Sequence, residues 1–222
     1  MDSKLVSAEL RIQLRPLLKS VGFARFTDRN AWRHADGRID VINFQSFNSW
    51  LAEGLGCTTY SFAVNLGCAF TSIPRQVPFR LRGGLALPNE WECDLRRGLR
   101  KQIDQPEFLR ENVWYVDERG RYLMPSVIDV KHVLTDHGLP WFERFADRTE
   151  VLRTLLEDAD DHAGTWGFGS NPSPMRALLI AYTALDLGQS ELAREHLEWL
   201  VAQGSPLATE EVRRDLNVLQ AA

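Results

Sequence analysis

The stretch that decides the fold is Tyr60-Ser61-Phe62-Ala63-Val64-Asn65-Leu66-Gly67-Cys68-Ala69-Phe70. Bulky and small residues alternate along it, which is the period of a β-strand whose side chains point to opposite faces of a sheet. We expect the bulky face to lie in the core. The small face, which includes Gly67, allows a helix or another backbone to approach the strand closely.

Three antiparallel strands are expected before this one. Residues 23–26 and 31–34 flank a Thr-Asp-Arg-Asn turn, and Asp36-Gly37 is a hairpin signal ahead of a strand over residues 38–47. These strands and the central one predict an antiparallel sheet.

A helix is expected in front of the strands. Apolar residues recur with helical spacing over residues 3–21, and Gly22 follows as a stop. Pro16 lies inside this pattern, where it cannot donate a backbone hydrogen bond, so we expect a kink or a fresh helical start there.

The segments after the central strand are less regular. Residues 92–103 are interpreted as a short polar helix, and residues 113–116 as a further strand. Ser126 is expected to cap a helix that runs to Thr135, because Asp129 stands three residues later, as the acidic partner in a capping box does.

The rest of the chain predicts helices. They are expected over residues 139–145, 149–158, 174–187, 190–203 and from Thr209 onward. Three glycines and two prolines in residues 164–174 mark the clearest break, which suggests an α+β domain over 1–163 and a helical extension over 164–222. The predicted fold class is therefore α+β: an antiparallel sheet of about five strands with helices on one face, plus a C-terminal α-helical hairpin.

Composition excludes several classes of protein. With 222 residues, 44% of them hydrophobic, the chain can bury a core without disulfides or metals, and its three cysteines are odd in number and never arranged as Cys-x-x-Cys. No secretory signal or membrane-spanning run is recognised, so a cytoplasmic location and no membrane partner are expected.

The net charge of −4 conceals an asymmetry. Residues 1–126 contain 18 Lys and Arg against 14 Asp and Glu, whereas residues 127–222 contain 8 against 16. This difference in charge between the two halves of the chain affects which partners the protein can bind more than it affects the fold.

Several motifs resemble a known family. The motifs are Leu17-Leu18-Lys19-Ser20-Val21-Gly22-Phe23, Trp32-Arg33, Val41-Ile42-Asn43-Phe44-Gln45-Ser46, Phe62-Ala63-Val64-Asn65-Leu66-Gly67 and Gly138-Leu139-Pro140-Trp141-Phe142. Over about residues 5–155 the chain is similar to the bacterial domain of unknown function 4304, which implies an α+β fold and no assigned active site. Outside that range, Ala184 to Leu197 is similar to half of a tetratricopeptide repeat, and a single unit builds no solenoid.

No catalytic, cofactor or metal signature is recognised. Asp129, His132 and Asp136 share a helix face and could ligate a metal, but they lie opposite an apolar stripe and are expected to be solvated surface. The glycine-rich residues 164–170 lack the Lys-Ser/Thr ending of a phosphate loop and are interpreted as a linker with a packed tryptophan.

Three functions from different classes remain open. The leading one is a non-enzymatic protein-binding module, such as an immunity or accessory protein that neutralises a bacterial toxin or effector. Its contacts are expected in a loop that carries Trp50 and Leu51, and in an acid cluster, Glu157, Asp158, Asp160 and Asp161, which is otherwise a solvated helix end.

The second function is an enzyme whose site is assembled from dispersed polar residues, with Asn43, Gln45 and Asn65 as its lining. The third is a weak nucleic-acid binder that uses Arg96, Arg97, Arg100 and Lys101, although nearby acids dilute their charge. The sequence leaves the oligomeric state open.

Overall fold

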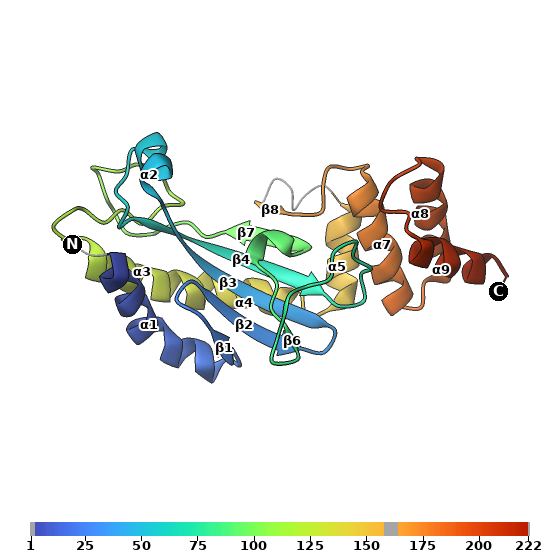
Figure 1. Ribbon diagram of the computed structural model, residues 1–222, viewed down its shortest axis with the longest axis horizontal. Helices are drawn as coiled ribbons and strands as arrows, with labels where there is room; N and C mark the ends of the chain where they lie inside the picture. The colour runs from blue at the N-terminus through green and yellow to red at the C-terminus, as the bar shows by residue number, and fades with distance from the viewer. Residues whose placement is uncertain (1–2, 158–163, 222) are drawn as a thin grey trace.

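The centre of the protein is a six-stranded antiparallel sheet, seen in a computed structural model that describes residues 3–157 and 164–221 (Figure 1). Its strand order is β1-β2-β3-β4-β7-β8, and β5 and β6 form a separate hairpin. The strands are β1 (Arg25–Phe26), β2 (Asn30–Ala35), β3 (Arg38–Ser46), β4 (Phe62–Phe70), β5 (Leu81–Arg82), β6 (Leu85–Ala86), β7 (Leu95–Gly98) and β8 (Thr165–Trp166).

Helices precede, interrupt and follow the strands. They are α1 (Ser3–Ser20), α2 (Ser49–Leu55), the short 3-10 helix η1 (Glu90–Glu92), α3 (Leu123–Val133), the π-helical turn η2 (Leu134–Gly138), α4 (Leu139–Arg144), α5 (Arg148–Leu156), α7 (Pro174–Asp186), α8 (Ser190–Ala202) and α9 (Glu210–Ala221). The α+β class and the C-terminal hairpin of α7 and α8 are confirmed, and the two helices are joined at Gly188, whose φ of 71° is the left-handed conformation that glycine adopts readily.

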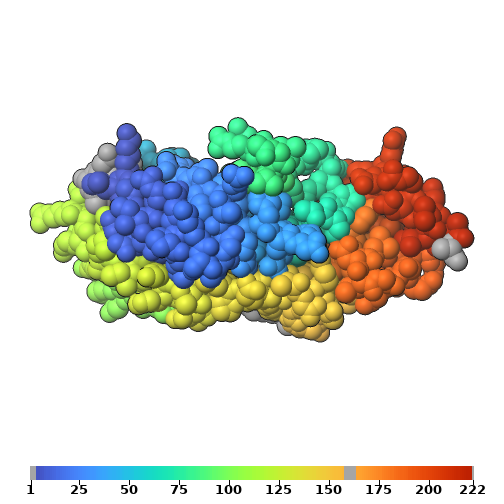
Figure 2. Space-filling model, turned by 90° about the horizontal axis from the view of Figure 1, so that it is seen from below, coloured from blue at the N-terminus to red at the C-terminus, as the bar shows by residue number. Residues whose placement is uncertain are grey.

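One face of the sheet carries the main core. The bulky residues of β4, such as Val64 and Leu66, are fully buried there and belong to one apolar cluster with residues of α1, α3, α4 and α5. Figure 2 shows α1, in dark blue, beside the yellow helices, and the C-terminal helices in orange and red at one end of the molecule. Cys68 is also buried in this cluster.

The opposite face is covered only at its two ends. At one end, Phe79, Ala86 and Leu87 pack on Trp32 and its neighbours in β3 and β4. At the other end, α2 and the segment that contains Phe108 pack on Phe47 and Ala63. The middle of this face remains open, and that opening defines the candidate site.

The C-terminal residues are joined to the sheet and to its core. Thr165 and Trp166 form β8, which pairs with Arg96 and Arg97 of β7. Phe168 is buried in the same cluster as the sheet residues. The division into a domain over 1–163 and an extension over 164–222 stays a prediction.

Three segments differ from the expectation. Residues 113–116 were expected to form a strand, but there Trp114 makes an isolated bridge with Phe62 and no strand is formed. Residues 92–103 were expected to be helical, but Leu95–Gly98 form β7, because β4 offers an unpaired edge with which they pair from Asn65 to Cys68. Residues 48–56 were expected to be a loop, but they contain α2, which the Asn48 side chain caps by accepting a hydrogen bond from the Leu51 N–H at 2.8 Å.

Two expectations about the helices also differ from the structure. The helix α1 continues through Pro16 without a break, and Ile12, whose carbonyl loses its donor, lies on the exposed side of the helix. Ser126 does not cap α3: it lies inside the helix, and its hydroxyl donates to the carbonyl oxygen of Tyr115.

Within the described residues, no helix combines the length and the apolar character needed to cross a membrane.

Substitution of Gly67 by alanine tests the close approach on the small face of β4. A Cβ at Gly67 would lie 2.6 Å from the Cys93 sulfur and 3.3 Å from the Glu90 carbonyl oxygen, so we expect Gly67→Ala to lower the free energy of unfolding by about 1–3 kcal/mol. The control is Gly54→Ala in α2, where nothing lies within 4 Å and alanine is expected to stabilise the helix by about 0.5–1 kcal/mol. Urea unfolding of both variants measures this, and equal effects would contradict the close approach.

Candidate functional site

A groove lies on the open middle of the sheet, between α2 on one side and η1 on the other. Its volume is about 650 Å³. We call it the amide groove, and the residues that line it are Arg29, Asn30, Asn43, Gln45, Ser46, Phe47, Asn48, Leu51, Asn89, Glu90, Trp91 and Arg96.

The side-chain amides of Asn30, Asn43 and Gln45 line the floor of the amide groove, and Asn65, which is not among the lining residues, adjoins them on β4. Asn30, Asn43 and Asn65 lie side by side on three neighbouring strands, because the register pairs Asn30 with Asn43 and Asn43 with Asn65. Asn43 donates to Asn30 at 2.7 Å, and Asn65 donates to Gln45 at 2.9 Å. The four amides therefore form two hydrogen-bonded couples.

The wall formed by η1 is held on the sheet by hydrogen bonds. The Asn89 N–H donates to the Glu92 carboxylate at 2.6 Å, which closes the turn, and the Trp32 indole N–H donates to the carbonyl oxygen of Pro88 at 2.7 Å. Trp91 projects from this wall and is 62% exposed. A rigid turn thus presents a large apolar side chain to solvent.

The wall formed by α2 contributes Leu51 and Asn48. Leu51 is half-exposed and lines the groove. Trp50 is 76% exposed on the same helix but is not among the residues that line the groove. Of the two residues predicted in this segment, Leu51 therefore belongs to the groove and Trp50 to the adjoining surface.

One ion pair lies at the end of the groove nearest β7. Arg96 contacts both carboxylate oxygens of Glu90, at 2.7 Å from Nε and 3.2 Å from the second guanidinium nitrogen. This forked geometry is the strong form of a charge-assisted hydrogen bond. Glu90 is buried and Arg96 also lies over the Trp166 ring, 5.7 Å from its centroid, so both charges are already compensated within the chain.

The groove offers hydrogen bonds and apolar contact rather than proton transfer. Glu90 is the carboxylate among the described lining residues, and Arg96 holds it. Neither histidine nor cysteine belongs to that lining. Of the three residues predicted to line an enzyme site, Asn43 and Gln45 line the groove and Asn65 is hydrogen-bonded to Gln45 beside it. A general acid or base, however, needs a titratable group within reach of the substrate.

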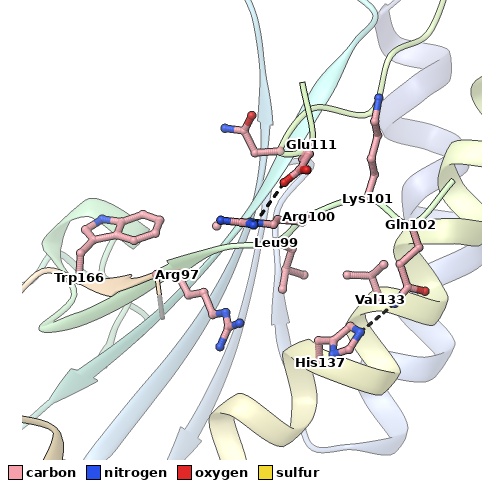
Figure 3. A pocket seen from close by; sticks show the side chains of 12 residues that line it. Arg97, Leu99, Arg100, Lys101, Gln102, Glu111, Val133, His137 and Trp166 are labelled. Carbon is pink, nitrogen blue, oxygen red and sulfur yellow. Dashed lines mark hydrogen bonds and ion pairs between the residues drawn. The ribbon is translucent and has the colours of Figure 1, made fainter. Parts of the chain in front are cut away.

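A second hollow of about 590 Å³ lies at the edge of β7, and we call it the basic cleft. Figure 3 shows Arg100 facing Glu111, with 3.2 Å between their charged atoms, and His137 beside Gln102. The side chain of Lys101 extends away from Arg97 in the same view. Cations, amides and an exposed tryptophan thus surround this cleft.

The cations predicted for nucleic-acid binding are spread out and engaged with other groups. Arg96 and Arg97 are adjacent in β7, so they point to opposite faces of the sheet. The Lys101 ammonium donates to the carbonyl oxygen of Phe108 at 2.6 Å and to Gln105 at 3.1 Å, and burial lowers the pKa of Lys101. Counterion release needs several uncompensated cations along one surface, which this arrangement does not present.

Of the predicted acid cluster, the structure describes Glu157 alone. Glu157 is ion-paired with Arg153 at 2.5 Å, while Asp158, Asp160 and Asp161 lie outside the described residues. Asp129 was expected to be solvated, but it is buried and accepts hydrogen bonds from the Trp114 indole N–H at 2.8 Å and the Gln102 N–H at 3.0 Å.

Expectations about metals and the glycine-rich linker can also be compared with the structure. Among the residues it describes, no group of three or more His, Cys, Asp or Glu is placed to hold a metal ion. In residues 164–170 the packed aromatic residue is Phe168, whereas Trp166 is 41% exposed. That tryptophan lies over Gly98, where an added Cβ would meet its ring at 3.4 Å.

Sequence reasoning missed the η1 wall. Asn89 stands three residues before Glu92, which is the spacing of a capping box, so this signal was present in the sequence. The helix expected over 92–103 begins at Glu92 and conflicts with this capping box.

Removal of Arg96 tests the ion pair at the end of the groove. We expect Arg96→Met to lower the free energy of unfolding by about 2–3 kcal/mol, because it leaves the buried Glu90 carboxylate without its charged partner. Adding Glu90→Gln should recover part of that loss, because the neutral amide costs less to bury. Urea unfolding of the single and double variants measures both effects, and an Arg96→Met variant as stable as the parent would contradict the pairing.

Comparisons with known proteins place the groove within a family. No curated protein matches the chain. No solved structure matches it either. A family model, described as Domain of unknown function (DUF4304), matches residues 14–144. That range includes every residue that lines the amide groove and excludes α7, α8 and α9. Because the match covers more than half of the 222 residues, the chain belongs to the DUF4304 family.

Proposed function

We propose that this protein is a non-enzymatic binding module that takes a partner protein into the amide groove. The observation that supports this most is the lining of the groove, which combines hydrogen-bonding amides on the floor with exposed Leu51 and Trp91 on opposite walls. Exposed aromatic side chains beside a concave polar surface are typical of interaction sites.

The partner in this proposal is a toxin or effector, and the protein acts as an immunity or accessory protein in the bacterial cytoplasm. Its three cysteines are free thiols, which fits a reducing compartment. A binding module of this kind needs an accessible surface and no catalytic groups, and the groove provides such a surface.

An enzyme is the weaker alternative. Its support is the presence of Asn43 and Gln45 in the groove with Asn65 beside them, but amides neither accept nor donate protons near neutral pH. Nucleic-acid binding is weaker still, because Arg96 and Arg100 are paired with carboxylates.

Co-purification with groove variants tests the proposal. A tagged copy recovered from its bacterial host at about 150 mM salt, where exposed charges are screened beyond ~8 Å, is expected to carry one stoichiometric protein, identified by mass spectrometry. The double variant Leu51→Ala, Trp91→Ala is expected to lose that protein, because truncation removes the apolar anchors from both walls.

The matched control is the double variant Val77→Ala, Val218→Ala. Val77 and Val218 are 77% and 64% exposed and lie outside the groove, so this control is expected to retain the partner. If the partner is captured equally by the parent, the groove variant and the control, the groove is not the binding surface. If the parent is recovered alone, the protein-binding function itself is rejected.

A further inference from the structure

We propose that the amide groove binds an extended segment of the partner by pairing with its backbone, two residues at a time. This inference rests on the proposed function and names the form of the partner that the groove accepts. It follows from three features of the groove: the hydrogen-bonding groups left on its floor, their spacing, and the position of its walls.

Each amide couple leaves one donor and one acceptor without a hydrogen-bond partner among the described residues, and Asn30, Asn43 and Gln45 line the groove while Asn65 adjoins it. In the first couple, Asn43 donates to Asn30, which leaves the Asn30 NH2 and the Asn43 carbonyl oxygen. In the second, Asn65 donates to Gln45, which leaves the Gln45 NH2 and the Asn65 carbonyl oxygen. If both amides of a couple rotated by half a turn, the couple would still present one donor and one acceptor.

A residue of an extended chain presents the matching pair of groups. In a β-strand, the N–H and C=O of one residue point to the same side, and the next residue that points to this side is two positions along. One couple therefore satisfies the N–H and C=O of one residue, and the other couple satisfies the residue two positions away.

The spacing of the couples agrees with that repeat. The first couple joins β2 to β3, and the second joins β3 to β4, with Gln45 two residues beyond Asn43 along β3. With strands about 4.8 Å apart and a rise of about 3.4 Å per residue, the two couples lie about 6 Å from centre to centre. Two residues of an extended chain span about 6.6–6.8 Å.

The walls define the direction of the segment. η1 lies over Gly67 of β4, and α2 follows the end of β3, so the groove between them crosses the strands. A segment that crosses β2, β3 and β4 with its backbone toward the floor projects successive side chains alternately toward Trp91 and Leu51. Backbone pairing would give affinity, and the two walls would select side chains.

Peptide selection followed by backbone methylation tests the inference. Random dodecapeptides displayed on phage are selected against the full chain, and the selected peptide is measured by titration calorimetry. N-methylation at alternate residues of that peptide is expected to weaken binding by about tenfold or more, because it removes backbone N–H donors from the segment. The double variant Gln45→Leu, Asn65→Leu in the protein is expected to weaken binding by about the same factor, because it removes the hydrogen bonds to one residue of the segment.

The matched control is Asn217→Leu, the same amide-to-leucine change at an exposed position of α9. It is expected to leave peptide binding unchanged, and thermal melting establishes that all variants are folded. If binding is lost with Leu51→Ala and Trp91→Ala but withstands N-methylation and the Gln45 and Asn65 variants, the inference is overturned.

The two proposals can fail separately. If the groove variants release a folded partner protein and no selected peptide depends on the groove, the extended-segment inference fails and the proposed function stands. If neither a protein nor a peptide depends on the groove, while an oligosaccharide array yields a ligand that does, both fail and the amides serve a sugar.

Discussion

The contact between Gly67 and the turn over residues 89–93 is the constraint on which the groove depends. At Gly67 the sheet carries no side chain, so the Glu90 carbonyl and the Cys93 side chain lie directly on β4. This contact brings η1 onto the sheet, places Trp91 at the rim and directs the following residues into β7. A larger residue at this position would lift the turn from the sheet and widen or remove one wall of the groove.

The polar floor explains why the middle of this face is open while its ends are covered. Trp32, Val41 and Ala69 are apolar and are buried under the segment before η1, and Ala63 is buried beneath α2. Between these ends stand Asn43, Gln45 and Asn65. Covering them would strip water from their unpaired groups, at a cost of about 1–3 kcal/mol for each group left unsatisfied. The chain closes over the apolar ends and leaves Gln45 exposed and Asn65 half-buried, while Asn43 beside them is buried.

Outside the groove, several charged side chains are paired with one another within the chain, which limits their use in binding a charged partner. Asp94 is buried, accepts from the Phe70 N–H at 2.7 Å and pairs with Arg75, while Arg148 near it approaches Asp186 of α7 at 3.5 Å. Arg148 also donates to the carbonyl oxygen of Gly37, between β2 and β3, at 2.8 Å, so this side chain of α5 links the sheet to α7. The basic residues therefore join parts of the fold, and the asymmetry of charge along the sequence does not become a basic stripe.

The range matched by the family model is shorter than the part of the chain that builds the sheet and its core. The matched range ends at residue 144, before α5, yet β8 extends the sheet and Phe168 enters the main core. The groove belongs wholly to the matched range. The helices α7, α8 and α9 contribute apolar contacts to the core but none of the groups in the groove.

The sequence by itself determined the antiparallel strands β1 to β4, the helix α1, the C-terminal helical hairpin and the family, because these follow from local periodicity, turn residues and contiguous motifs. The role of Leu51 as a partner contact stays a prediction. Sequence reasoning also grouped Asn43, Gln45 and Asn65. Tertiary structure alone decided that Leu95–Gly98 form a strand, that Asp129 is buried against Trp114, and that Asn30 joins Asn43 in the groove. Each of these features depends on a contact with a residue distant in the chain. The local sequence of a segment determines its preference for helix or strand, but it does not show which sheet edge or which buried face of another segment it will pack against.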